Sequence, residues 1–359
     1  MKIRTKSSII NHIPVIHGGK NHLNFDPNII DFSSNISPIG TPSDVKAILK
    51  KNLSNIENYP DLNSSEVISS LKKYTCLPKS NLIVGNGAIE IIYNFCFAFL
   101  SNKTKVLICI PTFQEYETAA KLNNCKILFF ETMNLSKNID YFISQIPKNG
   151  CIFLCNPNNP TGKLLSKKQL VLIIKAAKKI SSIVFVDECF IEMVPKSNES
   201  ILSYVKKYDN LFVLRSLTKS FGLAGIRIGY AAASKEMIAI LQKIKIPWSV
   251  NSLAQNAAIT ALKNNSHLIK SNLIIKKELD FLKNKINQLN GFECYDSSTN
   301  FILIKTKHDS TKLQKKLLQH QILIRDCKNF RGLNNHYIRI AVKSHQDNLK
   351  LVTALERII

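Results

Sequence analysis

The sequence predicts an α/β protein with a mostly parallel, seven-stranded sheet and a smaller α+β domain toward the C-terminus. Two observations support this class. From about residue 64 onward, short apolar runs alternate with helical patterns, which is typical of parallel strands covered by helices on both faces. After Pro247-Trp248-Ser249 this alternation gives way to a long helical stretch and then to separate strands. With 359 residues, the chain is long enough for two domains.

The individual elements follow from the spacing of apolar residues. The expected strands of the large sheet are residues 82–84, 106–110, 126–130, 151–154, 183–187, 211–214 and 228–232, and the expected helices are 64–74, 88–100, 115–122 and 166–180. The link before the last strand contains too little helix for a parallel crossover, which indicates an antiparallel strand. The second domain is expected to contain a helical region at 252–289 and strands at 301–304, 322–324 and 337–341.

These elements imply a division into three parts. We expect an N-terminal arm at residues 1–45 that packs with the small domain, a large domain at 46–245 and a small domain at 246–359. No apolar run approaches the ~18 residues of a membrane span, and the N-terminus lacks the apolar core of a signal peptide. Nine cysteines without metal-ligand spacing indicate reduced, mostly buried thiols. These features predict a cytoplasmic protein with no metal and no membrane partner.

The net charge of +24 raises the alternative of a nucleic-acid-binding protein. The lysines never occur more than two together, and in the expected helix 166–180 most of them lie opposite the apolar face. A solvated surface explains this pattern, so we expect no nucleic-acid partner. The alternative predicts a colourless protein that retains DNA or RNA in a salt-sensitive manner.

The segment from Ser216 to Lys219, with Arg227 eight residues further on, directly follows the apolar run 211–214. A lysine that forms an imine with an aldehyde cofactor must first lose a proton, which nearby positive charge and desolvation favour. The serine hydroxyl and the arginine guanidinium are donors that a cofactor phosphate needs. This arrangement predicts an anchor for pyridoxal 5'-phosphate.

Four further loops follow predicted strands, and ligands collect at the carboxyl ends of parallel strands. The glycine turn at Gly87-Ala88 opens a helix whose free N–H groups suit a phosphate. Phe113 can lie flat on a planar cofactor, and Asn159, in a rigid loop with two prolines, can offer its amide to a ring hydroxyl oxygen. Asp187 ends a buried strand and needs a positive partner such as a protonated pyridine nitrogen. Together the five segments predict a pyridoxal-phosphate site.

These motifs resemble the fold-type I pyridoxal-phosphate enzymes, in the branch that contains the histidinol-phosphate aminotransferases and the L-threonine-O-3-phosphate decarboxylases. The similarity extends from His17 to the C-terminal helix. The segments that are similar to the decarboxylases in particular are 17–19, 31–40, 59–61, 187–191, 247–251 and 327–333. The resemblance implies a transferase-like large domain of fold type I.

The resemblance also implies the cofactor ligands. Lys219 forms the imine with the cofactor, Asp187 pairs with the ring nitrogen, Asn159 faces the ring hydroxyl and Phe113 stacks on the ring. The implied ligands of the cofactor phosphate are Ser216, Arg227, Gly87, Ala88 and, from a partner subunit, Tyr59.

The implied substrate site contains two arginines. Arg339 binds the α-carboxylate and Arg325 binds the substrate phosphate, while Asn35 and His17, the latter from the other subunit, complete the site. The resemblance therefore implies a homodimer with its sites at the interface and a small phosphorylated amino acid as the substrate.

The implied activity is the decarboxylation of L-threonine O-3-phosphate to (R)-1-aminopropan-2-yl phosphate for cobalamin biosynthesis. The alternative is an aminotransferase that acts on histidinol phosphate or an aromatic amino acid. Phe190 stands where the aminotransferases usually have a tyrosine, which favours the decarboxylases. Lys20 departs from the decarboxylase pattern, which usually has asparagine there. The sequence does not distinguish threonine phosphate from serine phosphate.

Overall fold

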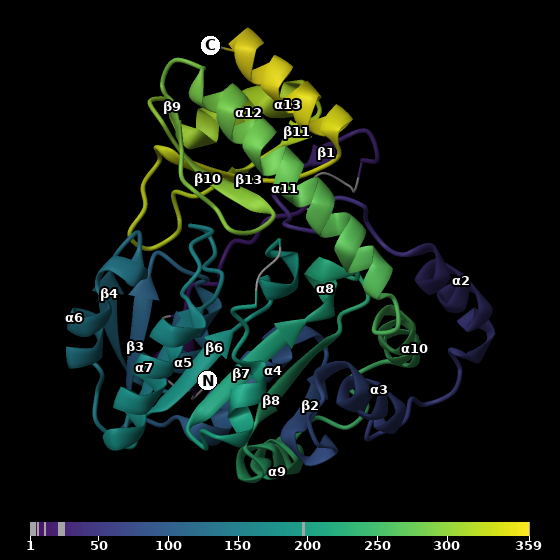
Figure 1. Cartoon of the computed structure of the whole chain (residues 1–359), viewed down its shortest axis with the longest axis vertical. Coiled ribbons are helices and arrows are strands. Elements are labelled where there is room, and N and C mark those ends of the chain that lie inside the picture. The colour runs from purple at the N-terminus through teal and green to yellow at the C-terminus, as the bar shows by residue number, and fades with distance from the viewer. Residues whose placement is uncertain (1–4, 6, 11, 21–25, 196–197, 359) are drawn as a thin grey trace, which may run out of the picture.

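The computed structural model describes residues 5, 7–10, 12–20, 26–195 and 198–358. Figure 1 shows a large α/β part below and a small part above, with the long helix α11 (Asn265–Asn287) running between them. The expected fold class is confirmed: the large part contains a mostly parallel seven-stranded sheet, and the small part contains an antiparallel sheet.

The large sheet contains all seven strands that the apolar runs predict. In spatial order they are β2 (Leu82–Gly85), β8 (Gly229–Ala233), β7 (Leu211–Ser216), β6 (Ile183–Asp187), β5 (Cys151–Cys155), β3 (Lys105–Ile110) and β4 (Lys126–Glu131). In this sheet β8 runs antiparallel to both of its neighbours, β2 and β7, as its short link predicts. Because β8 turns back, its first residue lies at the edge where the other strands end.

Side chains along the central strands alternate between two apolar cores. On β6, Phe185 faces one core, whereas Val184 and Val186 face the other. The first core is covered by α4 (Gly87–Phe99), α5 (Glu115–Leu122) and α9 (Lys235–Ile244). The second is covered by α2 (Ser43–Lys51), α3 (Ser65–Thr75), α6 (Ile139–Ser144), α7 (Lys167–Lys179) and α10 (Ser252–Ala261). A sheet buried on both faces explains why its strands read as continuous apolar runs.

The small part packs three helices on one face of a four-stranded antiparallel sheet. The strands, in order, are β12 (Arg325–Asp326), β13 (Tyr337–Ala341), β10 (Phe301–Thr306) and β9 (Phe292–Cys294), and the helices are α11, α12 (Ser310–Gln319) and α13 (His345–Ile358). The expected strand 322–324 is split, because β11 (Ile322–Leu323) pairs instead with β1 (Ile30–Asp31) from the arm. The ring of Phe32, the next residue of the arm, is buried in the apolar core of the small part.

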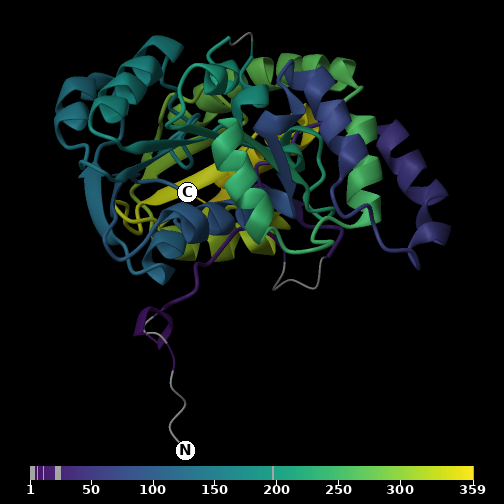
Figure 2. The same ribbon diagram turned by 90° about the horizontal axis from the view of Figure 1, so that it is seen from below.

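The remaining elements are short. Helix α1 (Ser7–Ile10) lies against α5 at the edge of the molecule, where the chain leaves the body in Figure 2, and α8 (Leu217–Ser220) follows β7. The 3-10 helices are Leu53–Asn55, Lys79–Asn81, Leu135–Lys137, Ile191–Met193 and Leu202–Lys206. None of the helices in the described part of the chain has the length and apolar character that a membrane span requires.

The expected helical region 252–289 is interrupted at residues 262–264, where the Asn264 side chain accepts from the His267 N–H and begins α11. Helix α10 packs on α2 and α3 and adds Ala254 and Ala258 to a core of the large sheet. We therefore propose that the two domains divide within α11 rather than at residue 246. The sequence alone does not show this, because α10 and α11 have the same helical pattern.

Candidate active site

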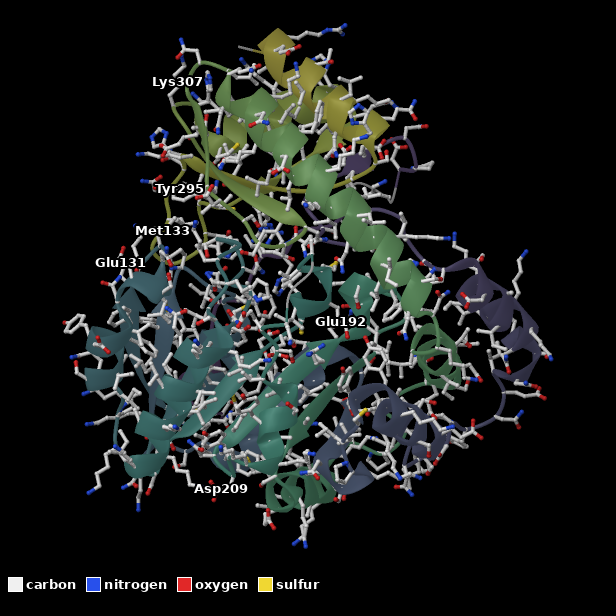
Figure 3. The ribbon with its side chains drawn as sticks, in the orientation of Figure 1. Glu131, Met133, Glu192, Asp209, Tyr295 and Lys307 are labelled. Carbon is white, nitrogen blue, oxygen red and sulfur yellow. The ribbon has the colours of Figure 1, made fainter. Side chains whose placement is uncertain are left out.

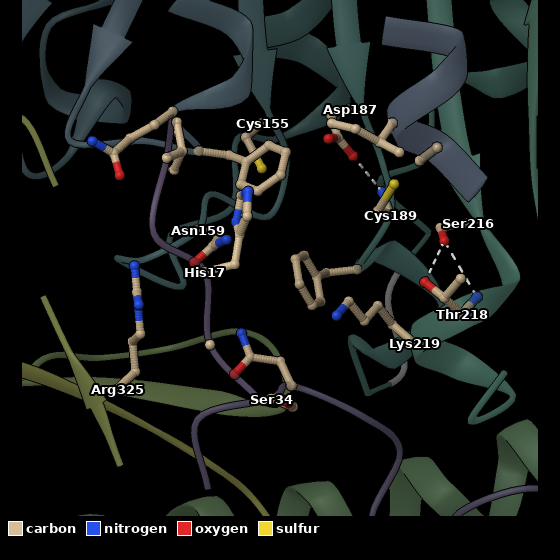
Figure 4. A pocket seen from close by; sticks show the side chains of 18 of the residues that line it. His17, Ser34, Cys155, Asn159, Asp187, Cys189, Ser216, Thr218, Lys219 and Arg325 are labelled. Atoms are coloured by element: carbon tan, nitrogen blue, oxygen red, sulfur yellow. Dashed lines mark hydrogen bonds between the residues drawn. The ribbon is translucent and has the colours of Figure 1, made fainter. Parts of the chain in front are cut away.

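A cavity of about 480 Å³ lies between the carboxyl-end edge of the large sheet, the small sheet and the arm (Figure 4). Most of the predicted site residues line it, namely His17, Asn35, Ala88, Phe113, Asn159, Asp187, Ser216, Lys219, Arg227, Arg325 and Arg339. Their convergence follows from strand register, since Cys155 pairs with Asp187, and Ser216 and Gly85 both pair with Gly229.

Lys219 lies on α8, which begins at the Ser216 cap, and its amine points into the cavity (Figure 4). The Lys219 carbonyl accepts from the Ser37 N–H at 2.9 Å, which ties this turn to the arm. Burial, followed by the charges of Arg339 and Arg227, lowers the pKa of the Lys219 amine to about 8. The lysine is therefore poised to lose a proton near neutral pH.

Asp187 ends β6 with its carboxylate buried beside the cavity. One oxygen accepts from the Cys189 N–H at 2.8 Å and the other accepts from the Tyr116 hydroxyl at 2.6 Å. Burial raises the pKa of Asp187 despite these bonds. Among the residues that the structure describes, Asp187 has no cationic partner, so a positively charged group in the cavity would complete it.

Arg227 lies over the N-terminus of α4. Its backbone adopts a left-handed φ of 64°, which is strained for a side chain of this kind, and its Nη1 donates to the Ala224 carbonyl at 2.9 Å. A Cβ on Gly87 would come within 2.5 Å of the Arg227 Nη2, so glycine makes room for the guanidinium. The guanidinium and the free N–H groups of the helix thus lie together, as an anion site requires.

Ser216 and Thr218 supply hydroxyls to the same place. Their two side-chain oxygens are 2.6 Å apart, and the Ser216 Oγ also accepts from the Thr218 N–H at 3.2 Å (Figure 4). Gly229 lies opposite, where a Cβ would come within 2.6 Å of the Ala88 nitrogen. This close packing brings the beginning of α4 against the sheet edge and forms a cradle of donors that fits a phosphate.

Arg339 joins the small sheet to the loop that holds Asn159. Its Nη1 donates to the Asn159 Oδ1 and its Nη2 donates to the Ser33 carbonyl at 2.7 Å, while its Nε is buried without a partner among the described residues. Because Oδ1 of Asn159 is engaged, the NH₂ of the amide is the end left for another group.

Arg325 and Arg339 are directly opposite each other on the antiparallel strands β12 and β13. They are only 8% and 6% exposed, and within the described chain neither has a carboxylate partner. Burial, and then the charge of Arg325, lowers the pKa of Arg339 to about 10. Like charges in opposite positions destabilise a sheet, so this pair is suited to bind two anionic groups.

His17 lies in the cavity of its own chain. Its Nε2 is 2.7 Å from a carboxylate oxygen of Glu115, and the other oxygen of Glu115 accepts from the Tyr93 hydroxyl at 2.8 Å. Burial alone would raise the pKa of Glu115, but these hydrogen bonds outweigh it and lower the pKa. Asn35 lies nearby, with its buried Oδ1 unpartnered within the described residues.

Tyr59 lies outside the cavity. Its side chain is 82% exposed, and its ring is 4.9 Å from the ring of Trp248. The cavity of a single chain therefore does not include it.

A buried ionic network supports the loop that follows Asp187. Arg215, at the end of β7, donates to Glu188 at 2.8 Å and to Glu192 at 3.1 Å, and Tyr74 also donates to Glu192 at 2.8 Å. Figure 3 shows Glu192 near α11, and its carbonyl accepts from Asn272 on that helix. The network fixes the backbone from which Cys189 and Phe190 face the cavity.

Sequence reasoning missed several residues that shape the site, above all Tyr116, Glu115 and Thr218. Tyr116 falls three residues after Phe113 on the buried face of α5, so helical spacing could have pointed to it. Thr218 lies inside the lysine motif itself. No sequence signal identifies Glu115, because its role depends on the fold of the arm.

The buried amine, the carboxylate without a cationic partner among the described residues, and the cradle of donors lie at one sheet edge. They match the aldehyde, the ring nitrogen and the phosphate of pyridoxal phosphate. The fold and this site define a pyridoxal-phosphate enzyme of fold type I. The family model "Aminotransferase class I and II" matches residues 27–358, and the chain belongs to this family.

Relatives of both activities are similar to this chain. A protein of Caldanaerobacter subterraneus subsp. tengcongensis with the provisional name of threonine-phosphate decarboxylase is 36% identical over 347 residues, covering 95% of this chain and 93% of that protein. The histidinol-phosphate aminotransferase of Methanococcus aeolicus is 33% identical over 344 residues, covering 94% and 92%.

Solved structures are also similar to this chain. The histidinol-phosphate aminotransferase of Clostridium acetobutylicum has a TM-score of 0.84 and 32% identity, covering 91% of this chain and 98% of that chain. The fold also matches the histidinol-phosphate aminotransferase of Sinorhizobium meliloti in complex with pyridoxal 5'-phosphate, with a TM-score of 0.86 and 18% identity over 100% and 99% of the two chains. The cofactor of this protein is pyridoxal 5'-phosphate.

Proposed function

We propose that the protein decarboxylates L-threonine O-3-phosphate to (R)-1-aminopropan-2-yl phosphate, a building block for cobalamin. The observation that carries this proposal is the buried pair Arg325 and Arg339, which lacks carboxylate partners in the described chain. A buried charge is costly unless it is paired. A small amino acid with an α-carboxylate and a side-chain phosphate supplies one anion for each arginine.

We propose a set of cofactor ligands, of which all but Gly87 and Tyr59 line the cavity. Lys219 would hold the cofactor aldehyde, Asp187 would pair with the ring nitrogen, Asn159 would donate its NH₂ to the ring hydroxyl oxygen, and Phe113 would contact the ring. The proposed phosphate ligands are Ser216, Arg227, Gly87, Ala88 and Tyr59 of the partner subunit.

The substrate residues surround the remaining space. Arg339 binds the α-carboxylate and Arg325 binds the substrate phosphate. The unpartnered Oδ1 of Asn35 can accept from the substrate amine, and His17 lies where it can contact the phosphate from the arm. These substrate residues belong to the arm and to the small sheet, whereas most of the cofactor ligands belong to the large sheet. Substrate binding would therefore connect all three parts.

The bound cofactor supplies an electron sink for the bond that breaks at the substrate α-carbon. Orientation selects that bond, and Arg339 controls the orientation of the carboxylate. The lowered pKa of Lys219 lets its amine hold or release a proton near the α-carbon at neutral pH. Phe190 faces the cavity without a hydroxyl and packs on Phe301 at 5.1 Å, which leaves Asn159 as the proposed donor to the ring hydroxyl oxygen.

We further propose a homodimer in which Tyr59 reaches the partner's site. Ile56, Tyr59 and Ile246 are at least 58% exposed and Trp248 is 48% exposed, which leaves an apolar surface suited to a partner subunit. Mixing of Tyr59→Ala and Lys219→Ala chains provides a test. In each mixed dimer one active site then contains both substitutions and the other contains neither. At limiting cofactor, the activity of the mixture should therefore exceed that of the Tyr59→Ala dimer and that of the Lys219→Ala dimer. No gain over the parents, in dimers shown to have exchanged, would contradict the proposal.

We also place the protein in the cytoplasm. All nine cysteines are free, and burial raises the pKa of several, including Cys96 and Cys151. Buried thiols of this kind are typical of a reducing compartment.

The alternative is an aminotransferase, which the relatives of that name support. Such an enzyme would use the arginine pair for a dicarboxylic amino acid such as glutamate. One assay separates the two: the purified holoenzyme receives threonine phosphate, and separately histidinol phosphate with 2-oxoglutarate. We expect carbon dioxide and the amino-alcohol phosphate from the first mixture, and none with Lys219→Ala. Glutamate from the second mixture without carbon dioxide from the first would overturn the proposal.

A further inference from the structure

Asn329, in the loop between β12 and β13, connects three segments at the cavity wall. Its Oδ1 accepts from the Arg325 Nη2 at 3.1 Å, and its Nδ2 donates to the Ile16 carbonyl in the arm at 3.2 Å. Its own carbonyl accepts from the Gln114 Nε2, next to Phe113, at 2.5 Å. Asn329 thus fixes the position of Arg325 relative to both the arm and the large sheet.

Every acceptor that Arg325 contacts in the described chain is neutral. Besides Asn329, its Nη2 donates to the Ile16 carbonyl at 2.6 Å, and its guanidinium lies 5.4 Å from the centre of the Phe330 ring. The neighbouring acid, Asp326, lies next along β12, where alternation turns its side chain to the opposite face. There the Asp326 carboxylate accepts from the hydroxyls of Ser310 and Thr311. The charge of Arg325 is therefore held in place but not neutralised.

We propose that Asn329 is a specificity-determining positioning residue: its amide orients Arg325 while leaving the full positive charge available for the phosphate of the substrate. This inference rests on the proposed function, which places the substrate phosphate at Arg325. A carboxylate of the same size at position 329 would accept the same hydrogen bond from Arg325 and lose only the donation to the Ile16 carbonyl, but it would form an ion pair with Arg325. The choice of amide over acid then decides whether this arginine binds an anionic ligand.

The surrounding loop holds Asn329 rigidly. Arg331 forms two hydrogen bonds with Glu117 on α5, at 2.9 and 2.7 Å, and its guanidinium lies 4.5 Å from the centre of the Phe129 ring. The Phe330 N–H donates to the Cys327 carbonyl within the loop. A substitution at Asn329 that keeps its size should therefore leave the loop in place.

The test compares Asn329→Asp with Asn329→Ala in the holoenzyme. For Asn329→Asp we expect KM for threonine phosphate to increase about tenfold or more, with kcat changed less than about threefold, because a charge-assisted contact is lost. Asn329→Ala, which adds no charge, should raise KM by less than Asn329→Asp. The midpoint of urea unfolding should not fall in Asn329→Asp, because the new ion pair compensates the buried charge.

A purely structural role predicts the reverse order, because alanine loses both side-chain hydrogen bonds, to Arg325 and to the Ile16 carbonyl, whereas aspartate loses only the second. That order, or an Asn329→Asp enzyme with the wild-type KM, would overturn the inference. Binding of inorganic phosphate, measured by calorimetry, tests the role of Asn329 separately from the proposed decarboxylase function. If the wild-type protein does not turn over threonine phosphate, the proposed function fails, yet Asn329→Asp should still bind phosphate more weakly than Asn329→Ala. Equal phosphate affinity in the two variants would refute the role of Asn329 by itself.

Discussion

The protonation of Lys219 can be measured without the cofactor. Burial and the charges of Arg339 and Arg227 lower its pKa from 10.5 to about 8. At pH 7 an amine with this pKa is neutral in roughly one molecule in ten, whereas an ordinary lysine is neutral in fewer than about one in a thousand. The difference corresponds to roughly 3 kcal/mol between the two protonation states.

The assay is competitive acetylation of the cofactor-free protein between pH 6 and pH 11, with the labelling of each lysine read by mass spectrometry. We expect the labelling of Lys219 to reach half of its plateau at about pH 8 and to level off above about pH 9, while exposed lysines of the same sample continue to gain label. In Arg339→Gln the labelling of Lys219 should level off at a higher pH. Most of the lowering of the Lys219 pKa should remain, because burial is its larger cause. A Lys219 profile that keeps rising to pH 10 would refute the reasoning.

The lowered pKa of Lys219 also makes the stability of the cofactor-free protein depend on pH. Because the pKa of Lys219 is about 8 in the folded chain and 10.5 in its ordinary state, the unfolded chain binds more protons between these values. Lys219 therefore destabilises the cofactor-free protein below pH 8, and this cost disappears as the pH rises toward 10.5. Urea unfolding of the wild type and of Lys219→Met should differ most at low pH and converge at high pH.

Two further substitutions test the support of the site. Arg215→Met should cost about 3–5 kcal/mol in the free energy of urea unfolding, because it leaves two buried glutamates without their cation; a loss below about 1 kcal/mol would contradict the network. Gly229→Ala should weaken cofactor binding, measured by dialysis, by more than about tenfold while the protein stays folded. The reason is that the new Cβ would collide with the Ala88 nitrogen. Gly225→Ala is the control, since a Cβ there meets nothing within 4 Å; equal losses in both variants would disprove the steric account.

The large sheet could be predicted because each of its strands is a nearly continuous apolar run, and five of the seven are followed by a loop of distinctive composition. Strands β1 and β9 could not, since each has only two or three residues and forms through pairing with distant segments. The split of the expected strand 322–324 has the same origin, because β11 pairs with the arm rather than with the small sheet.

Much of the candidate site was predictable for a related reason. Lys219, Asp187 and Asn159 belong to loops whose composition suggests their chemistry. The roles of Glu115 and Asn329 depend on where the arm crosses the cavity, and local sequence does not encode that path. The place of His17 depends on the same path, because Glu115 binds it within its own chain.

The reversal of β8 makes Lys219 and Arg227 neighbours on a single excursion of the chain. It leaves the sheet at Ser216 and returns beside the same residue at Gly229. Both functional groups are therefore tethered at each end to one pair of hydrogen-bonded strands, and an insertion or deletion in this excursion would displace them jointly. A design that transfers Lys219 to another scaffold would therefore have to include both β7 and β8. Without them, Arg227 would not lie beside the lysine.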